Sequence, residues 1–401
     1  MFKISNPILP LFLLMFMSCS PHKRNTNSAN HQLKIDNHSK SSPINSFSPG
    51  KKMIDNNGIP INAHGGGIMY YNGKYYWYGQ HMVEGKTGNR AQVGVHVYSS
   101  DDLYNWIDQG IALKVIDDDP EHDITKDCIL ERPKVIYNEK TNKFVMWFHL
   151  ELRDNGYKSA RSGVAISDTP EGPFTYLRSF RPNAGFWPVN VKPIHKEPVS
   201  EDVKDAYCGG EGCLPSHPDT VNLLGRDFLG GQMARDMTLF VDADGKAYHI
   251  YSSEENSTLH ISQLSDDYTS YSGVYARFFV GRYMEAPSIF RTSKGKYFFI
   301  GSGCTGWAPN AARAAVADHI FGPWRELENP CIGEGAELTF ESQSTYILPV
   351  QGQKDQFLFM ADRWKPENPI DGRYIWLPIK IGENSISIEW KDEWTLEDFS
   401  D

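Results

Sequence analysis

The chain has 401 residues, enough for one large domain or two ordinary ones, and a formal net charge of −10 at pH 7. An acidic chain lacks the positive surface that binds phosphate backbones, so the charge argues against nucleic acid as a partner. Aromatic residues make up 13% of the chain, with 10 Trp and 20 Tyr. That content suits β-strands and also suits stacking on sugar rings, so it does not distinguish a strand-rich fold from a sugar-binding surface.

The first 19 residues have the pattern of an export signal. An apolar run over 8–17 is too short to span a membrane and ends just before Cys19. The sequence "FMSC" is similar to a bacterial lipoprotein cleavage box, with Phe16 where Leu is usual. We expect a lipoprotein-type signal peptide over 1–19, with ordinary secretion as the alternative. Residues 20–50 are too polar to fold and are predicted to be a disordered tether.

The export pattern also predicts where the protein resides. We expect it in the periplasm or on the outer-membrane surface of a Gram-negative bacterium, in contact with the membrane only through a lipid at Cys19. In an oxidising compartment Cys208 and Cys213, in the Gly-rich stretch "YCGGEGC", can form a local disulfide.

One short pattern recurs over 51–401. A turn with Gly, Asn or Lys precedes alternating aromatic and aliphatic residues, which is typical of a tight turn followed by a β-strand. The copies are "NGKYYWYG" (72–79), "TNKFVMWFH" (141–149), "DGKAYHIYSS" (244–253), "GKYFFIGSG" (295–303) and "KDQFLFMAD" (354–362).

Five strand–turn–strand units at intervals of roughly 50–70 residues, once one insertion is discounted, indicate repeated blades. We therefore predict an all-β fold, a five-bladed β-propeller over 51–401. A sandwich would show turn signals more often, at about every 8–12 residues. Residues 186–232 are rich in Pro and Gly with little strand pattern, and we expect them to be an insertion between blades two and three.

Polar residues interrupt the apolar strands once in each predicted blade. The inner strands of a propeller meet around its central channel, so one polar group per blade predicts a site at the channel mouth. Each group taken alone could be structural. The sequence context is "NAHGGGIMYY", "CILERPKVIY", "GGQMARDMTLFVD", "GRYMEAPSIF" with the later "GCTGWAPN", and "FESQSTYILP" with the later "ADRW".

Glu285 lies inside the apolar run "GRYMEAPSIF". An ionised carboxylate removed from water is costly unless it is paired, so burial favours its neutral form. A neutral carboxylic acid in a site can donate a proton to a leaving group. The alternative is a structural acid bonded to an arginine or to backbone donors.

The motifs "AHGGGI", "ERPKVIYN", "MEAPSIF", "GWAPN", "SQSTYILP" and "DRW…GRYIWLPI" together resemble glycoside hydrolase family 43, and within it the exo-β-1,3-galactanase branch. The resemblance covers most of residues 60–395. It implies a five-bladed β-propeller that hydrolyses glycosides with inversion, without a metal or other cofactor. On this basis the expected catalytic residues are Glu285, Glu131, Gln343 and Asp236, and the expected substrate-binding residues are His64, Gln80, Arg132, Trp307, Arg363 and Trp364.

The resemblance assigns Glu285 as the general acid and Asp236 as the residue that adjusts its pKa. The identity of the base stays open, because the first blade reads "AHG" where the wider family has an aspartate. The galactanase branch also lacks that aspartate, and the resemblance then gives Gln343 the task of positioning water. Glu131 is the chemically simpler base, since a neutral amide cannot ionise water. Two further features depart from the galactanase branch. Gln80 stands where galactanase relatives tend to have Glu, and the insertion at 186–232 is the second departure.

We therefore expect an exo-acting inverting enzyme that releases galactose from β-1,3-galactan or arabinogalactan-type polysaccharide. An α-L-arabinofuranosidase or β-galactofuranosidase of the same family is one alternative. A non-catalytic sugar-binding propeller, whose carboxylates only accept hydrogen bonds from sugar hydroxyls, is another.

Overall fold

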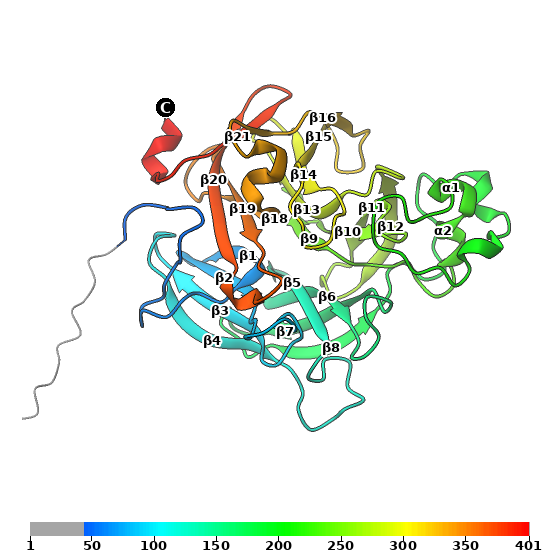
Figure 1. Ribbon diagram of the computed structural model, residues 1–401, viewed down its shortest axis with the longest axis horizontal. Helices are drawn as coiled ribbons and strands as arrows, with labels where there is room; N and C mark the ends of the chain where they lie inside the picture. The colour runs from blue at the N-terminus through cyan, green and yellow to red at the C-terminus, as the bar shows by residue number, and fades with distance from the viewer. Residues whose placement is uncertain (1–43, 401) are drawn as a thin grey trace, which may run out of the picture. The chain divides into compact units, whose positions relative to one another are not determined.

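The computed structural model describes residues 44–400. The predicted signal peptide, Cys19 and most of the predicted tether lie outside the described residues. Figure 1 shows sheets arranged around a common centre. Within 44–400, no helix has the length and apolar character needed to cross a lipid bilayer.

Each of the first three sheets is an antiparallel meander of four strands in chain order. Blade one consists of β1 (His64–Tyr71), β2 (Lys74–Gln80), β3 (Gly94–Ser100) and β4 (Ile107–Lys114). Blade two consists of β5 (Ile129–Asn138), β6 (Lys143–Glu151), β7 (Arg161–Ser167) and β8 (Thr175–Phe180). Blade three consists of β9 (Met237–Val241), β10 (Ala247–Ser253), β11 (Thr258–Leu264) and β12 (Tyr271–Phe278).

The last two sheets repeat the meander, with one added strand. Blade four consists of β13 (Glu285–Arg291), β14 (Tyr297–Ser302), β15 (Arg313–Ala317) and β16 (Arg325–Leu327). Blade five consists of β18 (Gln343–Pro349), β19 (Phe357–Arg363), β20 (Arg373–Ile381) and β21 (Ile386–Glu389). The short β17 (Cys331–Ile332) pairs in parallel with β21 at the outer edge. Three 3₁₀ turns accompany these strands, η3 (Ala336–Glu341), η4 (Pro369–Asp371) and η5 (Leu396–Ser400).

The first strands of the five blades, β1, β5, β9, β13 and β18, contact one another in a closed ring, with β18 returning to β1. This arrangement is a five-bladed β-propeller and confirms the predicted fold class. The five repeated sequence patterns are the second strand of each blade, β2, β6, β10, β14 and β19. The polar residues that interrupt the strands come at the beginning of the first strands.

The hydrophobic core is divided among the five interfaces between neighbouring blades. Side chains alternate across a strand, so each blade presents one apolar face to each neighbour. On β2, Tyr76 and Tyr78 pack against blade two, and Tyr75 and Trp77 pack against blade five. Sandwiching every sheet between two others explains why the strands are apolar on both faces.

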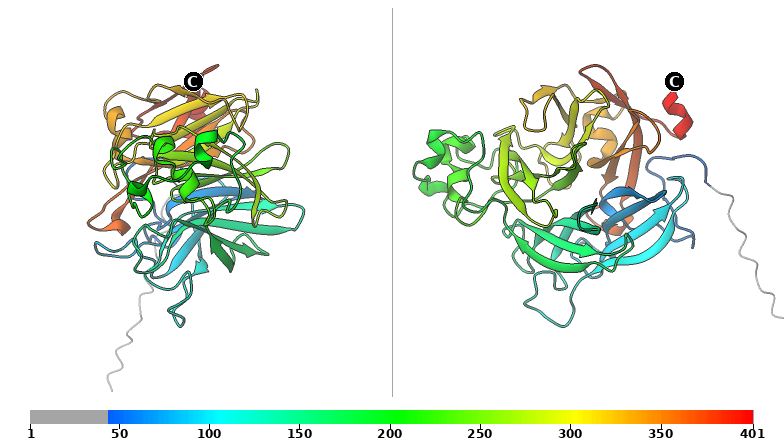
Figure 2. Two further views of the ribbon diagram at one scale, coloured as in Figure 1. Left: turned by 90° about the vertical axis from the view of Figure 1, so that its right-hand side faces the viewer. Right: turned by 180° about the vertical axis from the view of Figure 1, so that it is seen from behind.

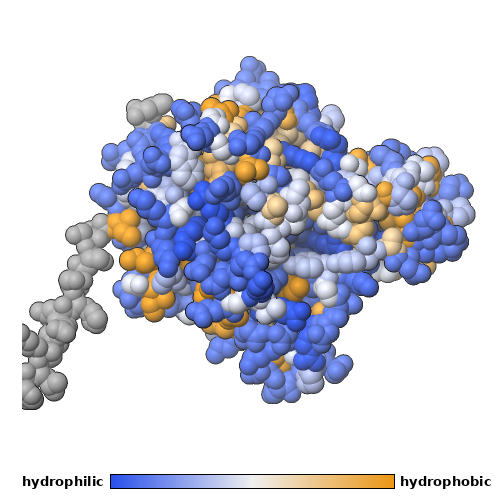
Figure 3. All heavy atoms as spheres, in the orientation of Figure 1, coloured by the Kyte–Doolittle hydropathy of each residue, from blue (hydrophilic) through white to orange (hydrophobic). Residues whose placement is uncertain are grey.

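The insertion at 186–232 forms a lobe outside the ring (Figures 1 and 2). It contains only short helical turns, η1 (Pro193–Lys196), η2 (Glu201–Val203), α1 (Pro218–Val221) and α2 (Leu223–Arg226). Its small core includes Val203, Val221 and Leu223. Figure 3 shows apolar patches among the polar surface of this lobe. No β-strand lies within residues 186–232.

The predicted disulfide between Cys208 and Cys213 is present in the insertion. The other cysteines of the described residues, Cys128, Cys304 and Cys331, are free and buried. The insertion is tied to blade three by the buried Arg277, whose guanidinium contacts Asp219 of the insertion at 3.0 Å and Glu254 of the propeller.

Candidate active site

The same local backbone distortion begins the first strand in three blades. The β1–β2, β5–β6 and β13–β14 pairings each skip register, between His64 and Gly67, between Glu131 and Lys134, and between Glu285 and Ser288. The residue after each first position has a positive φ: 61° at Gly65, 51° at Arg132 and 50° at Ala286. Such a bulge re-aims side chains at the end of a strand.

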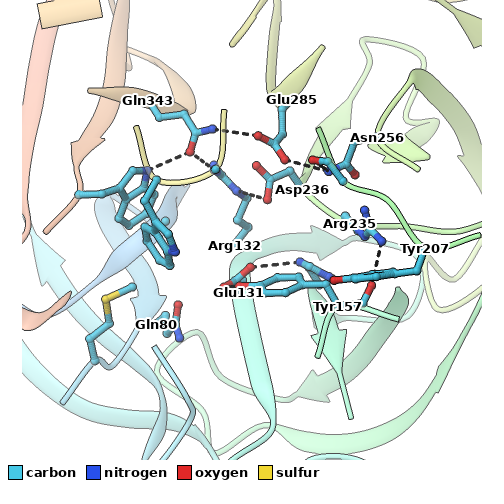
Figure 4. A pocket seen from close by; sticks show the side chains of 17 residues that line it. Gln80, Glu131, Arg132, Tyr157, Tyr207, Arg235, Asp236, Asn256, Glu285 and Gln343 are labelled. Atoms are coloured by element: carbon cyan, nitrogen blue, oxygen red, sulfur yellow. Dashed lines mark hydrogen bonds and ion pairs between the residues drawn. The ribbon is translucent and has the colours of Figure 1, made fainter. Parts of the chain in front are cut away.

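The bulge explains the sequence patterns "ERP" and "EAP". A bulged residue is left out of the ladder of hydrogen bonds, so a proline, which has no N–H, is tolerated there inside a strand. Glu131 and Glu285 precede these bulges and both point into a pocket at the centre of the molecule (Figure 4).

The pocket has a volume of about 220 Å³ and draws its walls from all five blades and the insertion. All four predicted catalytic residues and four of the six predicted substrate-binding residues line it. These eight residues are Glu285, Glu131, Gln343, Asp236, Gln80, Arg132, Trp307 and Trp364.

Glu285 carries the most strongly perturbed carboxyl group of the pocket. Burial, followed by the negative charge of Asp236, raises its pKa from 4.5 to about 8. Asn256 Nδ2 donates to Glu285 Oε1 at 3.0 Å, and the thiol of Cys304 lies 3.4 Å from the same oxygen. Glu285 is therefore protonated at neutral pH and is able to donate that proton into the pocket.

Asp236 is held beside Glu285 by an ion pair. Its Oδ1 lies 2.8 Å from Arg132 Nε, and both side chains are largely buried. Arg132 also donates to the backbone oxygen of Ser344 at 2.9 Å. Arg132 thus fixes the position of the charge that raises the pKa of Glu285, although the same guanidinium acts on that pKa in the opposite direction.

The side-chain amide of Gln343 is oriented by donors on its oxygen. Arg132 Nη2 donates to Gln343 Oε1 at 2.7 Å and Trp364 Nε1 donates at 2.9 Å. Because guanidinium and indole groups only donate, the amide oxygen must face them. The amide nitrogen then donates to Ser302 Oγ at 3.0 Å and lies 3.5 Å from Glu285 Oε2. Gln343 and Glu285 therefore point toward one another across the pocket, as Figure 4 shows.

Glu131 is engaged by two neighbours. Tyr157 donates its hydroxyl to Glu131 Oε1 at 2.7 Å, and His149 Nδ1 lies 3.3 Å from Oε2. Burial lowers the pKa of His149, but its contacts with Glu131 and Glu151 outweigh burial and raise that pKa to about 9. Both oxygens of Glu131 are therefore engaged by neighbouring protein groups.

Ligand atoms of Glu131, His149 and Asp236 lie within 4.8 Å of one another, a spacing that could hold a metal ion. The chemistry of the set does not fit a cation. Tyr157 already donates to Glu131 Oε1, and His149 Nε2 lies 2.8 Å from Glu151. Arg132 pairs with Asp236, so groups of the protein itself occupy this set.

Two predicted substrate-binding residues lie away from the pocket. His64 is fully buried, its ring stacks on Tyr374 with centroids 5.3 Å apart, and its Nδ1 lies 3.4 Å from Asp362 Oδ2. Arg363 donates to the backbone oxygen of Phe340 at 2.8 Å. Neighbouring residues of extended backbone point to opposite sides, so Trp364 lines the pocket while Arg363 faces away from it.

Several pocket residues were not predicted from the sequence: Met82, His149, Tyr157, Tyr207, Arg235 and Asn256. Asn256 carried one signal that could have found it. In the sequence it ends "SEEN", in which two acids and an amide directly follow an apolar strand. In the structure these last three residues have positive φ values between 50° and 62°. Such strained backbone is concentrated at functional sites. Tyr207 lies in the insertion, and its sequence gives no periodic pattern to place it.

Solved structures with the same architecture include several enzymes. A GH43 β-1,3-galactosidase with bound galactodeoxynojirimycin is 49% identical, with a TM-score of 0.81, over 87% of this chain and 100% of that chain. An exo-β-1,3-galactanase from Clostridium thermocellum is 35% identical, with a TM-score of 0.69, over 87% of this chain and 66% of that one.

An exo-β-1,3-galactanase from Phanerochaete chrysosporium in complex with galactose is 30% identical, with a TM-score of 0.68, over 88% of this chain and 68% of that chain. No protein-family model and no curated protein matches the chain. Full coverage of a relative at 49% identity, together with the propeller and its pocket, confirms the resemblance seen in the motifs. The chain belongs to glycoside hydrolase family 43.

Proposed function

We propose that the protein is an exo-acting, inverting glycoside hydrolase that releases galactose from β-1,3-galactan or arabinogalactan-type polysaccharide. The observation that carries the proposal is Glu285, a carboxylic acid with a pKa of about 8 inside a pocket lined by carboxylates and aromatic side chains. The three relatives described above, a β-1,3-galactosidase and two exo-β-1,3-galactanases, support galactose as the released sugar.

The size of the pocket supports exo action. Its volume of about 220 Å³ is below the range of about 300–1,000 Å³ that holds drug-sized ligands. A pocket of this size suits one terminal sugar unit, with the rest of the substrate outside the mouth. Trp307 and Trp364 meet edge to face in its wall, with centroids 5.4 Å apart, and offer an apolar surface to a sugar ring.

Glu285 would protonate the oxygen of the glycosidic bond as that bond breaks. The group must be neutral before the reaction, and burial together with Asp236 keeps it so. General acid catalysis of this kind contributes about 10²–10⁴-fold to the rate. Asn256 holds the carboxyl group in place through its hydrogen bond to Oε1.

The water that attacks the sugar requires a second group on the opposite face. We assign its positioning to Gln343, as the resemblance to the galactanase branch implies, while both oxygens of Glu131 are engaged by Tyr157 and His149. Two donors on the amide oxygen fix the plane of the Gln343 side chain. The amide nitrogen makes only a long contact of 3.5 Å with Glu285 Oε2, and it is the atom that would hold the water. A neutral amide is too weak a base to ionise water beforehand. The proton that the water releases as it attacks would pass through the side chain of Gln343 by tautomerisation between its amide and imidic acid forms.

The test is product analysis with the purified protein. β-1,3-Galactobiose and β-1,3-galactan should yield galactose as the only small product, and proton NMR in the first minutes should show the α anomer, as inversion requires. 4-Nitrophenyl α-L-arabinofuranoside and 4-nitrophenyl β-D-galactofuranoside are the matched comparison substrates. Faster hydrolysis of either one would reject the galactose assignment, and absence of hydrolysis with retained galactobiose binding would favour a binding protein.

We also propose that Cys19 carries a lipid that anchors the enzyme at the cell envelope. The support is the apolar run over 8–17 followed by "FMSC". Labelling of cells with a clickable fatty-acid analogue should mark the wild type and not the Cys19→Ala variant, and the variant should leave the membrane fraction. A Cys19→Ala protein that is still labelled would reject this proposal.

A further inference from the structure

The insertion reaches the pocket through residues 207–213, here called the disulfide loop. Backbone atoms of this loop are bound to the propeller at two points. The N–H of Cys208 donates to Glu255 Oε2 at 2.9 Å, and Arg235 Nη1 donates to the carbonyl oxygen of Cys208 at 3.0 Å. The bond between Cys208 and Cys213 closes the loop on itself, and the two contacts of Cys208 hold it against blade three.

The disulfide loop lies next to the general acid. The carbonyl oxygen of Gly209 accepts from Asn256 Nδ2 at 3.3 Å and from Cys304 Sγ at 2.5 Å. These are the two side chains that contact Glu285 Oε1. The loop therefore forms the wall of the pocket on the side of the proton donor.

Tyr207, at the start of the loop, lines the pocket and yet remains 48% exposed. The guanidinium of Arg235 lies 5.5 Å from its ring centroid, within cation–π range. Arg235 Nη2 also donates to the carbonyl oxygen of Tyr157 at 2.9 Å, which connects this edge of the pocket to the neighbour of Glu131. Figure 4 shows Tyr207 at the side of the pocket away from Gln80. A buried, charged side chain thus supports an aromatic ring that is still accessible at the mouth.

The position of Glu285 determines which part of a substrate would meet this ring. A general acid protonates the oxygen between the sugar that is released and the sugar that leaves, so the leaving sugar must lie beside it. In an exo enzyme the released sugar occupies the closed end of the pocket, and the leaving sugar lies at the mouth. Aromatic side chains are suited to this contact because they combine an apolar face with a polar edge.

We propose that Tyr207 is a specificity-determining residue that contacts the sugar on the leaving-group side of the scissile bond, and that the disulfide loop exists to hold it there. This inference rests on the proposed function. It identifies the insertion as part of the substrate site and accounts for a half-exposed aromatic residue beside a fixed arginine.

The experiment compares two substrates that share the released galactose and differ in the leaving group. β-1,3-Galactobiose places a sugar next to Tyr207, whereas β-D-galactosyl fluoride places only a fluoride ion there. In Tyr207→Ala, kcat/KM for galactobiose should fall by about tenfold, the upper range for one aromatic contact, while kcat/KM for the fluoride stays within twofold of wild type. Tyr207→Phe, which keeps the ring, should retain most of the galactobiose activity.

The matched control is Tyr70→Ala, since Tyr70 is also a partly exposed tyrosine, 38% exposed, but does not line the pocket. It should leave both substrates unchanged. Cys213→Ser, which opens the disulfide, should show the same selective loss as Tyr207→Ala. An unchanged galactobiose rate in Tyr207→Ala, or an equal fall for both substrates, overturns the inference while the proposed function stands. A wild-type protein that hydrolyses neither substrate overturns both.

Discussion

Replacing Glu285 by Gln removes the proton donor and little else. Gln has the same shape as Glu, and its amide oxygen can accept the hydrogen bond from Asn256 Nδ2 that now ends on Glu285 Oε1 at 3.0 Å. Its NH₂ group would then face Gln343 Nε2, which lies 3.5 Å from Oε2 and makes only a weak contact there. We therefore expect the Glu285→Gln variant to fold and to bind galactose.

The expected loss of activity follows from the role of the acid. A general acid contributes about 10²–10⁴-fold, equivalent to about 3–5 kcal/mol of transition-state stabilisation. Glu285→Gln should lower kcat for β-1,3-galactobiose by that factor. Hydrolysis of β-D-galactosyl fluoride should be largely retained, because fluoride departs with little need of a proton.

The raised pKa also gives the variant a signature in stability. In the folded wild type Glu285 keeps its proton up to about pH 8, whereas in the unfolded chain it loses the proton near pH 4.5. Below pH 4.5 both states are protonated and the buried acid costs nothing. As the pH rises above 4.5, the free energy of unfolding of the wild type falls by about 1.4 kcal/mol per pH unit. The fall at pH 7 is at most about 3 kcal/mol, and solvent screening of this partly exposed side chain makes it smaller. Gln does not titrate, so Glu285→Gln should melt higher than wild type at pH 7 and equally at pH 4.

The assays are initial rates on both substrates and thermal denaturation at the two pH values. Wild-type activity on galactobiose should decline as the pH rises through about 8, the pKa of Glu285. A Glu285→Gln variant that keeps more than a tenth of wild-type activity on galactobiose would refute the acid assignment. So would equal losses on galactobiose and on the fluoride.

The remaining predictions concern Asp236 and the activated water. Asp236→Asn removes the negative charge that helps to raise the pKa of Glu285, and it leaves Arg132 free to attract that carboxyl group. The decline of activity at high pH should therefore move to lower pH, and an unchanged pH profile would contradict this. Glu131→Gln should lose activity that azide partly restores if Glu131 is the base, whereas Gln343→Ala should lose activity without azide rescue if Gln343 positions the water. Gln343→Glu keeps an acceptor for Arg132 and Trp364 and should retain part of the activity, and full activity in Gln343→Ala would transfer the role to Glu131.

The sequence by itself determined the fold class. The turn-and-strand pattern recurs once in each blade because every blade is buried between two others and needs the same apolar, aromatic second strand. Closure of the ring depends on contacts between β18 and β1, which the repeated pattern does not specify, and an isolated bridge between Phe47 and Trp394 joins segments far apart in the chain. The sequence showed that a local disulfide between Cys208 and Cys213 is possible, because they lie five positions apart in a Gly-rich stretch, and the structure contains it.

The sequence also located most of the site. A polar residue at the start of an apolar inner strand is costly wherever it is buried, so Glu131 and Glu285 were visible as exceptions to the strand pattern. Asp236 and Gln343 were visible in the same way in blades three and five, and the family resemblance added their expected roles. The raised pKa of Glu285 follows from the same exception, since its cause is burial first and Asp236 second.

Only the tertiary structure decided the partners of these residues. Arg132 follows Glu131 directly in the chain, but the bulge turns its guanidinium to Asp236 and Gln343, which belong to other blades. His64 occupies the equivalent bulge in blade one and is nevertheless buried against Tyr374, so one backbone motif places an acid in the pocket and a histidine outside it. The placement of Tyr207 at the mouth depends on contacts between the insertion and blade three, and no pattern within the insertion encodes them. Side-chain periodicity reports which face of a strand is buried, whereas packing between distant segments decides what each polar group meets there.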